Sequence, residues 1–188
     1  MYYPTTTLGY GQRLSIWTIG CHRHCRSCSN PELQAPCPEK DVQVNELLQP
    51  IRSLVDKIDG VTITGGEPFD QPDDLLSLLT SIRSFGIRDI LVYTGYTLNE
   101  LIELGGSYST CLQQVGVLID GVYRDECNDG RSIRGSSNQV IHLLDKGLAE
   151  RYSDVLQWPR RSEVVNCNGL LISIGIPPKP SSFDNKKI

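Results

Sequence analysis

The chain contains 188 residues, of which 39% are hydrophobic and 21% charged, a composition typical of one folded domain and not of a disordered chain. Its 18 basic and 22 acidic residues leave a net charge of −4, which argues against nucleic acid or an anionic membrane as a partner held by bulk charge. The seven cysteines are an odd number, so they cannot all form disulfides within the chain.

The N-terminal segment gives a first indication of location. Residues 1–21 lack the basic start and unbroken apolar stretch of a secretory signal. No apolar run reaches the ~18–20 residues that cross a bilayer. We therefore expect a cytoplasmic protein, in which thiols stay reduced. Clustered cysteines in such a protein more often bind metal or perform chemistry than form disulfides.

The first third of the chain predicts a strand, a loop and a helix. Apolar and polar residues alternate over 14–19, which predicts a strand that Gly20 ends. Residues 30–41 are rich in proline and polar residues and predict a loop. Apolar residues then recur every three or four positions over 42–58, which predicts an amphipathic helix that Pro50 kinks or splits.

The rest of the chain alternates short apolar runs with amphipathic stretches. We predict helices over 70–85 and 98–104, and strands over 61–64, 90–94, 115–119 and, at the end, 170–174. Strands that are apolar on both faces and alternate with helices indicate an α/β fold with a covered parallel sheet. We expect one domain over residues 1–176 and a flexible tail over 177–188.

Unusual turns follow four of the predicted strands. Ligands of parallel sheets bind beyond the carboxyl ends of the strands, so turns there are candidates for a shared site. The four turns are the cysteine loop from Cys21, Gly65–Pro68, Thr94–Tyr96 and Asp120–Gly121. We expect them to lie together at one edge of the sheet.

The cysteine loop has the spacing C-x3-C-x2-C at Cys21, Cys25 and Cys28. Three thiolates this close in sequence can converge on one metal centre, but a closed structural site normally has four ligands. One interpretation is an iron–sulfur cluster with one open iron. The alternatives are a structural zinc site completed by His22 or His24, and chance clustering.

The turn at Gly65-Gly66-Glu67-Pro68 is suited to close contact with a ligand. Two glycines let the backbone adopt positive φ angles and approach a bound molecule, and Pro68 restricts the turn. Exposed carbonyl groups and the Glu67 carboxylate are acceptors for an ammonium group. Taken alone, the motif indicates only an ordinary tight turn.

The cysteine loop and the Gly-Gly-Glu-Pro turn together resemble the radical S-adenosylmethionine (SAM) superfamily. A further series of motifs in the same order is similar to activases of glycyl-radical enzymes. The series adds Asn30 after the cysteines, then Tyr93–Tyr96, Leu118–Gly121 and Arg134–Gln139, and the resemblance covers roughly residues 1–145. The extension from residue 146 has no counterpart in this resemblance.

The resemblance implies a compact, partial (β/α) barrel with parallel strands. It implies that Cys21, Cys25 and Cys28 hold a [4Fe–4S] cluster, whose open iron binds SAM. Reductive cleavage of SAM would yield a 5′-deoxyadenosyl radical that removes a hydrogen atom from a glycine of the partner. The implied partners are the catalytic subunit of anaerobic ribonucleoside-triphosphate reductase, or another glycyl-radical enzyme, and a flavodoxin- or ferredoxin-type electron donor.

The resemblance also assigns cofactor contacts. Ser27 stands where many superfamily members have an aromatic residue, so it would contact the cofactor without stacking. Asp120 is a candidate for the ribose hydroxyls, and Arg134 and Ser136 for the methionine carboxylate. The full set of expected cofactor-binding residues is Ser27, Gly65, Gly66, Glu67, Pro68, Tyr93, Thr94, Asp120, Arg134 and Ser136.

Two other functions remain open from the sequence. One is a radical SAM enzyme that acts on another glycyl-radical enzyme, a peptide or a small molecule. The other is a non-catalytic scaffold that binds a metal. We expect the four scattered cysteines, Cys37, Cys111, Cys127 and Cys167, to be buried or free thiols.

Overall fold

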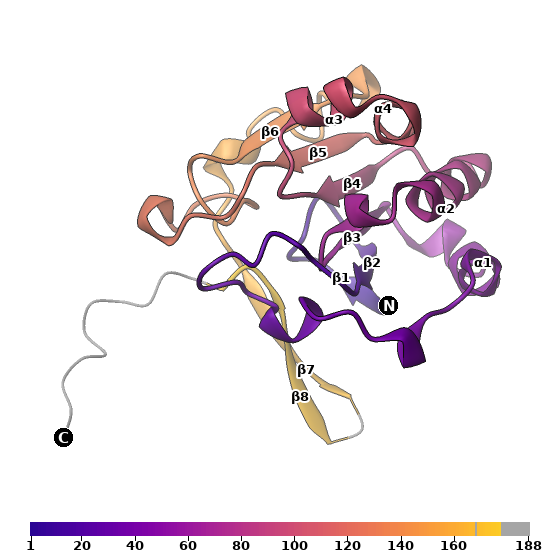
Figure 1. Cartoon of the computed structure of the whole chain (residues 1–188), viewed down its shortest axis with the longest axis horizontal. Helices are drawn as coiled ribbons and strands as arrows, with labels where there is room; N and C mark the ends of the chain where they lie inside the picture. The colour runs from indigo at the N-terminus through magenta and orange to yellow at the C-terminus, as the bar shows by residue number, and fades with distance from the viewer. Residues whose placement is uncertain (168, 178–188) are drawn as a thin grey trace.

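A six-stranded sheet forms the centre of the protein in a computed structural model that describes residues 1–167 and 169–177 (Figure 1). Its strands, in spatial order, are β1 (Tyr2–Thr5), β2 (Arg13–Thr18), β3 (Gly60–Gly65), β4 (Ile90–Tyr93), β5 (Val117–Asp120) and β6 (Val140–Leu143). The four strands β2 to β5 are parallel, and β1 and β6 pair antiparallel at the two edges. The expected α/β class with a mainly parallel sheet is therefore confirmed, and the described strands form an open sheet.

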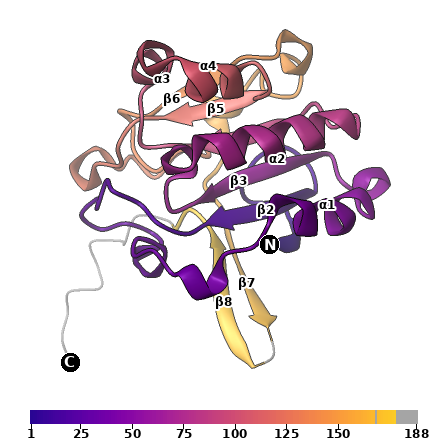
Figure 2. The ribbon, with the colours of Figure 1, turned by 45° about the vertical axis from the view of Figure 1, so that its right-hand side comes forward.

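Both faces of the sheet are covered, which explains strands without a polar face. The helices α1 (Val44–Arg52), α2 (Pro72–Ser84), α3 (Leu98–Leu104) and α4 (Gly106–Leu112) lie on one face (Figure 2). Along β4, Ile90 and Val92 pack with these helices, whereas Leu91 between them packs on the other face against Ile133 and Tyr152. The period of two along a strand divides the core in this way.

The predicted helix over 42–58 is divided. Helix α1 contains Pro50 and ends two residues later at Arg52, and a short 3-10 helix, Val55–Lys57, follows. Proline lacks the N–H of the helical ladder and disturbs the preceding turn, so the helix does not continue. The helix predicted over 70–85 is confirmed as α2, which begins at Pro72 and is followed by Gly86 with a φ of +86°.

The remaining predicted strands and the helix over 98–104 are confirmed, and four elements were not predicted. These are β1, β6, α4 and β7 (Ser162–Cys167). Strand β7 pairs antiparallel with β8 (Leu170–Gly175), the strand predicted over 170–174. Figures 1 and 2 both show this hairpin extending away from the central sheet. Most of the expected tail, from residue 178 onward, lies outside the described residues.

A buried ion pair joins the sheet to the extension near the amino end of β2. The guanidinium of Arg13 is fully buried and lies 3.0 Å from the Asp89 carboxylate. It also donates to Thr62 Oγ1 at 2.7 Å, and the hydroxyl of Tyr152 donates to Asp89 at 2.9 Å. Buried charges need such partners, so this cluster holds residue 152 of the extension against the sheet.

Among the described residues, no helix combines the length and apolar character needed to span a membrane.

Candidate functional site

A cavity of about 160 Å³ lies at the carboxyl ends of the parallel strands. Residues from all four predicted turns line it: the three cysteines after β2, Gly65 to Glu67 after β3, Thr94 and Gly95 after β4, and Gly121 after β5. The prediction that these turns share one edge of the sheet is confirmed. The structure adds a wall that was not predicted, because residues 173–176 of the extension also line the cavity.

Backbone hydrogen bonds hold the cysteine loop. The N–H of Gly20 donates to Leu33 at 2.9 Å, and that of Cys21 donates to Gln34 at 2.9 Å. The predicted loop over 30–41 thus folds back and supports the start of the cysteine loop. His24 and Ser27 adopt left-handed φ angles of 44° and 61°, which curl the loop around the cavity.

The three thiols are free, partly buried and supplied with hydrogen-bond donors. Burial raises the pKa of Cys21 and of Cys25, so both favour the neutral thiol when no metal is bound. Hydrogen bonds from the backbone of Arg23 oppose this for Cys21, and one from the backbone of Tyr123 opposes it for Cys25. The N–H of Asn30 lies 3.4 Å from the Cys28 sulfur.

This donor set fits an iron–sulfur cluster better than a single ion. In the described part of the chain, no three His, Cys, Asp or Glu side chains are grouped closely enough to hold one metal ion. A four-iron cluster takes its thiolates on separate iron atoms, and N–H groups directed at the sulfurs are its usual surroundings. Of the two candidate zinc ligands, His22 already hydrogen-bonds to Asp70 through Nδ1.

The glycine turn is attached directly to the cysteine loop. The N–H of Gly66 donates to the carbonyl of Thr18, and that of Glu67 donates to the carbonyl of Gly20, both at 2.8 Å. Gly65 has a φ of +104°, which disfavours any other residue. A Cβ on Gly66 would lie 2.2 Å from the Gly20 carbonyl oxygen. Both glycines are therefore required by the close approach of the two loops.

Glu67 joins the ends of β3 and β4. Its buried carboxylate accepts from the Phe69 N–H at 3.0 Å, from the Thr94 hydroxyl at 2.7 Å and from the Gly95 N–H at 2.7 Å. Burial raises the pKa of Glu67, and the hydrogen bond from Gly95 opposes that rise. The sequence suggested a carboxylate available to an ammonium group, whereas the structure shows one that already has three donors.

Two other predicted residues line the cavity, and Asp120 lies beside it. The partly buried Tyr93 donates its hydroxyl to the carbonyl of Ile133 at 2.7 Å, and Thr94 contacts Glu67 as described above. Asp120 accepts from the Leu98 N–H at 2.7 Å and lies 2.9 Å from His142 Nε2. Its carboxylate lines a neighbouring cavity beside α3.

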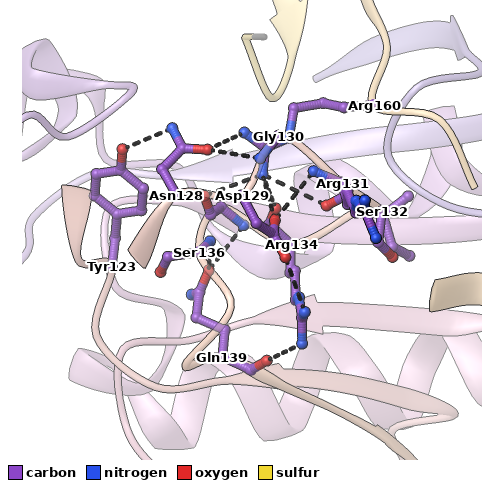
Figure 3. A network of polar contacts seen from close by, with 12 residues as sticks. Tyr123, Asn128, Asp129, Gly130, Arg131, Ser132, Arg134, Ser136, Gln139 and Arg160 are labelled. Carbon is purple, nitrogen blue, oxygen red and sulfur yellow. Dashed lines mark hydrogen bonds and ion pairs between the residues drawn. The ribbon is translucent and has the colours of Figure 1, made fainter. Parts of the chain in front are cut away.

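The segment predicted to bind the methionine carboxylate forms an internal network (Figure 3). Arg134 donates to the Gln139 carbonyl at 3.2 Å and pairs with Asp129 at 3.1 Å. The buried Ser136 hydroxyl accepts from the Arg124 N–H. Within the described residues, the cavity wall here is formed by Gly135 and Gln139, the neighbours of the predicted pair. Ser27 is exposed on the cysteine loop.

Several side chains of the cavity wall were not predicted from the sequence, among them Trp17, Gln34 and Tyr123. Tyr123 lines the cavity beside the cysteines, and Arg23 lies over the ring of Tyr96, 4.1 Å from its centroid. Tyr123 follows Asp120–Gly121 by two residues, and this closeness to a predicted turn was the signal available in the sequence.

The scattered cysteines agree with expectation where the structure describes them. Cys37, Cys111 and Cys127 are free thiols. Cys111 is buried, and burial raises the pKa of its thiol to about 12. The side chain of Cys167 lies outside the described part of the chain.

Comparison with known proteins agrees with this geometry. Residues 7–142 match a protein family described as a 4Fe-4S single cluster domain. The chain is also similar to several proteins named anaerobic ribonucleoside-triphosphate reductase-activating protein. The relative from Pasteurella multocida (strain Pm70) is 33% identical over 150 residues, which are 75% of this chain and 94% of the relative. The relative from Escherichia coli (strain K12) is 30% identical over 151 residues, or 76% and 96%. The protein of Enterobacteria phage T4 is 27% identical over 145 residues, or 74% and 89%.

Proposed function

The chain belongs to the 4Fe-4S single cluster domain family, and from this premise we propose that it is an activating enzyme that installs a glycyl radical on anaerobic ribonucleoside-triphosphate reductase. The observation that carries this conclusion is the cavity at the carboxyl ends of β2 to β5. Three free thiols and a glycine turn meet there, each on a loop that the parallel sheet positions.

Cys21, Cys25 and Cys28 would hold three irons of a [4Fe–4S] cluster and leave the fourth iron for SAM. When bound, the cluster supplies the single electron for reductive cleavage of SAM, which yields the radical that takes a hydrogen atom from a glycine of the reductase. The backbone N–H groups near the three sulfurs stabilise the thiolate form that iron requires.

The chain's own residues would orient SAM and exclude water. The turn from Gly65 to Pro68 would receive the methionine ammonium through backbone carbonyls, since the Glu67 carboxylate is already occupied by three donors. Glu67 instead keeps the ends of β3 and β4 together under the ligand. Tyr93 and Thr94 would form the floor of the cavity, where the hydroxyl of Tyr93 is held by the carbonyl of Ile133.

The open sheet supports a partial (β/α) barrel of the radical SAM type. Strands β2 to β5 are parallel, and their carboxyl ends hold the site, as in complete barrels. We propose that the reductase covers the open side when its glycine approaches. Arg23 and Arg26 on the cysteine loop would attract an acidic flavodoxin- or ferredoxin-type electron donor. The free thiols favour a reducing location such as the cytoplasm.

Anoxic reconstitution with iron and sulfide tests the cofactor assignment. We expect about four irons per chain and release of 5′-deoxyadenosine when reductant and SAM are added. Cys25→Ser should abolish this release, because it removes one thiolate of the set. Cys37→Ser is the matched control, since Cys37 contacts Glu39 and should leave the release unchanged. Full activity in Cys25→Ser, or one zinc without sulfide, would refute the assignment.

Electron paramagnetic resonance with the reductase tests the substrate. Incubation with the catalytic subunit should give the doublet of a glycyl radical, and Cys25→Ser should give none. If SAM is cleaved but the reductase shows no doublet, the partner is another glycyl-radical enzyme, a peptide or a small molecule. This second candidate is favoured by the extension, because residues 173–176 change the shape of the cavity beyond the family match.

A further inference from the structure

The chain beyond the family match returns to the cavity. The match ends at residue 142, and residues 173–176 near the end of the described chain form part of the cavity wall. Between them, Pro159 forms an isolated β-bridge with Arg131, and the N–H of Ser132 donates to the Trp158 carbonyl at 2.9 Å. The extension is therefore attached to the segment from residue 128 to residue 139 just before the hairpin begins.

Arg160 is the centre of this attachment (Figure 3). Its side chain is only 2% exposed. One nitrogen donates to the side-chain oxygen of Asn128 at 2.7 Å, and the other donates to the carbonyls of Arg134 at 2.6 Å and Gly135 at 3.1 Å. A guanidinium presents several donors in one rigid plane, so it can hold acceptors from two parts of the same loop at once.

Asn128 connects Arg160 to the cavity. Its side-chain nitrogen donates to the Tyr123 hydroxyl at 3.2 Å, while its oxygen accepts from Arg160. Gly135 packs on the same tyrosine, because a Cβ there would lie 2.8 Å from the ring. Both Tyr123 and Gly135 line the cavity with Cys25. Burial raises the pKa of the Cys25 thiol, and the neighbouring backbone of Tyr123 opposes that rise.

We propose that Arg160 is a positioning residue for the cofactor site: it holds the 128–135 segment and, through Asn128, fixes Tyr123 beside Cys25. This inference rests on the proposed function, since the position of Tyr123 matters when Cys25 binds a cluster. An N–H directed at a ligand sulfur raises the reduction potential of an iron–sulfur cluster. Arg160 would thus affect the shape of the cavity and the reduction potential of the cluster, although its own side chain contacts neither the cavity nor the cluster.

Three variants isolate this role. Arg160→Met keeps most of the length of the side chain and removes every donor. Arg160→Lys keeps the charge but cannot reach acceptors from two directions, so it should restore only part of the effect. Arg161→Met is the control, because its side chain is exposed and it removes an equal charge from the next position.

Hydrogen exchange of the metal-free chain is the first measurement. Arg160→Met should raise exchange by about tenfold over residues 121–139, as expected for the loss of a hydrogen bond to a charged group. Strands β2 to β4 should exchange as in the wild type. Wild-type exchange over 121–139, or an equal rise throughout the sheet, would overturn the positioning role. If Arg160→Met does not fold, Asn128→Ala tests the same connection to Tyr123.

The reconstituted enzyme provides the second measurement. Arg160→Met should shift the cluster's reduction potential to more negative values and raise the KM for SAM by about tenfold, with a smaller change in kcat. Arg161→Met should match the wild type in both. An unchanged reduction potential and KM in Arg160→Met would overturn the role of Arg160 and leave the proposed function standing. If the wild-type chain assembles no cluster, the proposed function fails, whereas hydrogen exchange still decides whether Arg160 holds Tyr123.

Discussion

Replacing Gly66 by alanine should impair the activity of the site far more than the stability of the fold. The added Cβ would lie 2.2 Å from the Gly20 carbonyl oxygen, about 0.8 Å closer than the 3.0 Å that real Cβ contacts respect. The obstacle is backbone, so no side-chain rotation can relieve it. Gly20 directly precedes Cys21 and accepts the 2.8 Å hydrogen bond from Glu67. The alanine must therefore push the glycine turn and the cysteine loop apart.

Two effects of different size should follow. Overpacking of this kind destabilises a protein by about 1–3 kcal/mol, so Gly66→Ala should still fold at room temperature. A displacement approaching 1 Å within a catalytic site reduces the rate by about 100-fold. We therefore expect a loss of 5′-deoxyadenosine release that is much larger than the loss of folded protein explains.

Urea unfolding and cofactor cleavage, measured on the same preparation, test this expectation. Gly86→Ala is the matched control, since Gly86 has a φ of +86° and a Cβ added there would meet no atom within 4 Å. Alanine there should cost about 1–2 kcal/mol of backbone strain and leave the site in place. Cleavage of SAM by Gly66→Ala at the wild-type rate, or an equal loss of activity in both variants, would show that the site does not depend on the close approach of the two loops.

Three further predictions concern polar groups of the fold. Arg13→Met should lower the free energy of unfolding by about 3–5 kcal/mol, because it leaves the Asp89 carboxylate buried without its main partner. Combining Arg13→Met with Asp89→Asn should recover part of that loss, as measured by urea unfolding. The pKa of Asp145 is lowered chiefly by its hydrogen bond with Arg88. The ionised carboxylate therefore stabilises the folded protein above pH 3.8, and this contribution is lost as the pH falls through the lowered pKa. Asp145→Asn should flatten the decline of the urea midpoint below pH 3.8. Glu67→Gln should cost about 1–3 kcal/mol at pH 7, since an amide N–H then faces a backbone N–H, and urea unfolding measures this cost.

Each of these predictions has an outcome that contradicts it. A double variant whose loss of stability equals the sum of the losses in the two single variants would show that Arg13 and Asp89 do not depend on each other. An unchanged acid profile in Asp145→Asn would place the acid-sensitive group elsewhere. A negligible effect of Glu67→Gln at pH 7 would show that the raised pKa keeps this carboxyl protonated, which removes the charge from the wall of the site.

The main features of the site could be predicted because they are local in sequence. The spacing of Cys21, Cys25 and Cys28 and the turn from Gly65 to Pro68 are contiguous motifs, and apolar runs located the parallel strands before them. Parallel strands bring their carboxyl ends to one edge, so the meeting of these turns follows from the element order alone. The four missed elements are β1, β6, β7 and α4, which are short and carry weak periodicity.

The roles of single polar side chains could not be predicted in the same way. The sequence suggested that Glu67 faces a ligand, and the fold gives its carboxylate three internal donors. Arg134 was expected at the methionine carboxylate, and it hydrogen-bonds within its own loop. A polar group binds whichever partner the folded chain brings within reach. In a buried position this pairing is nearly obligatory, because an unpaired buried group costs more free energy than one hydrogen bond contributes.

Local sequence patterns were enough to indicate the type of chemistry, because three cysteines and a glycine turn follow successive strands of a parallel sheet. The wall of the cavity, in contrast, depends on contacts between segments that are distant in sequence. Arg160 lies 32 positions from Asn128, yet it donates to it at 2.7 Å, and residues 173–176 line the same space as Cys21. Such contacts form only when distant segments of the chain come together in the fold, so local sequence patterns do not predict them.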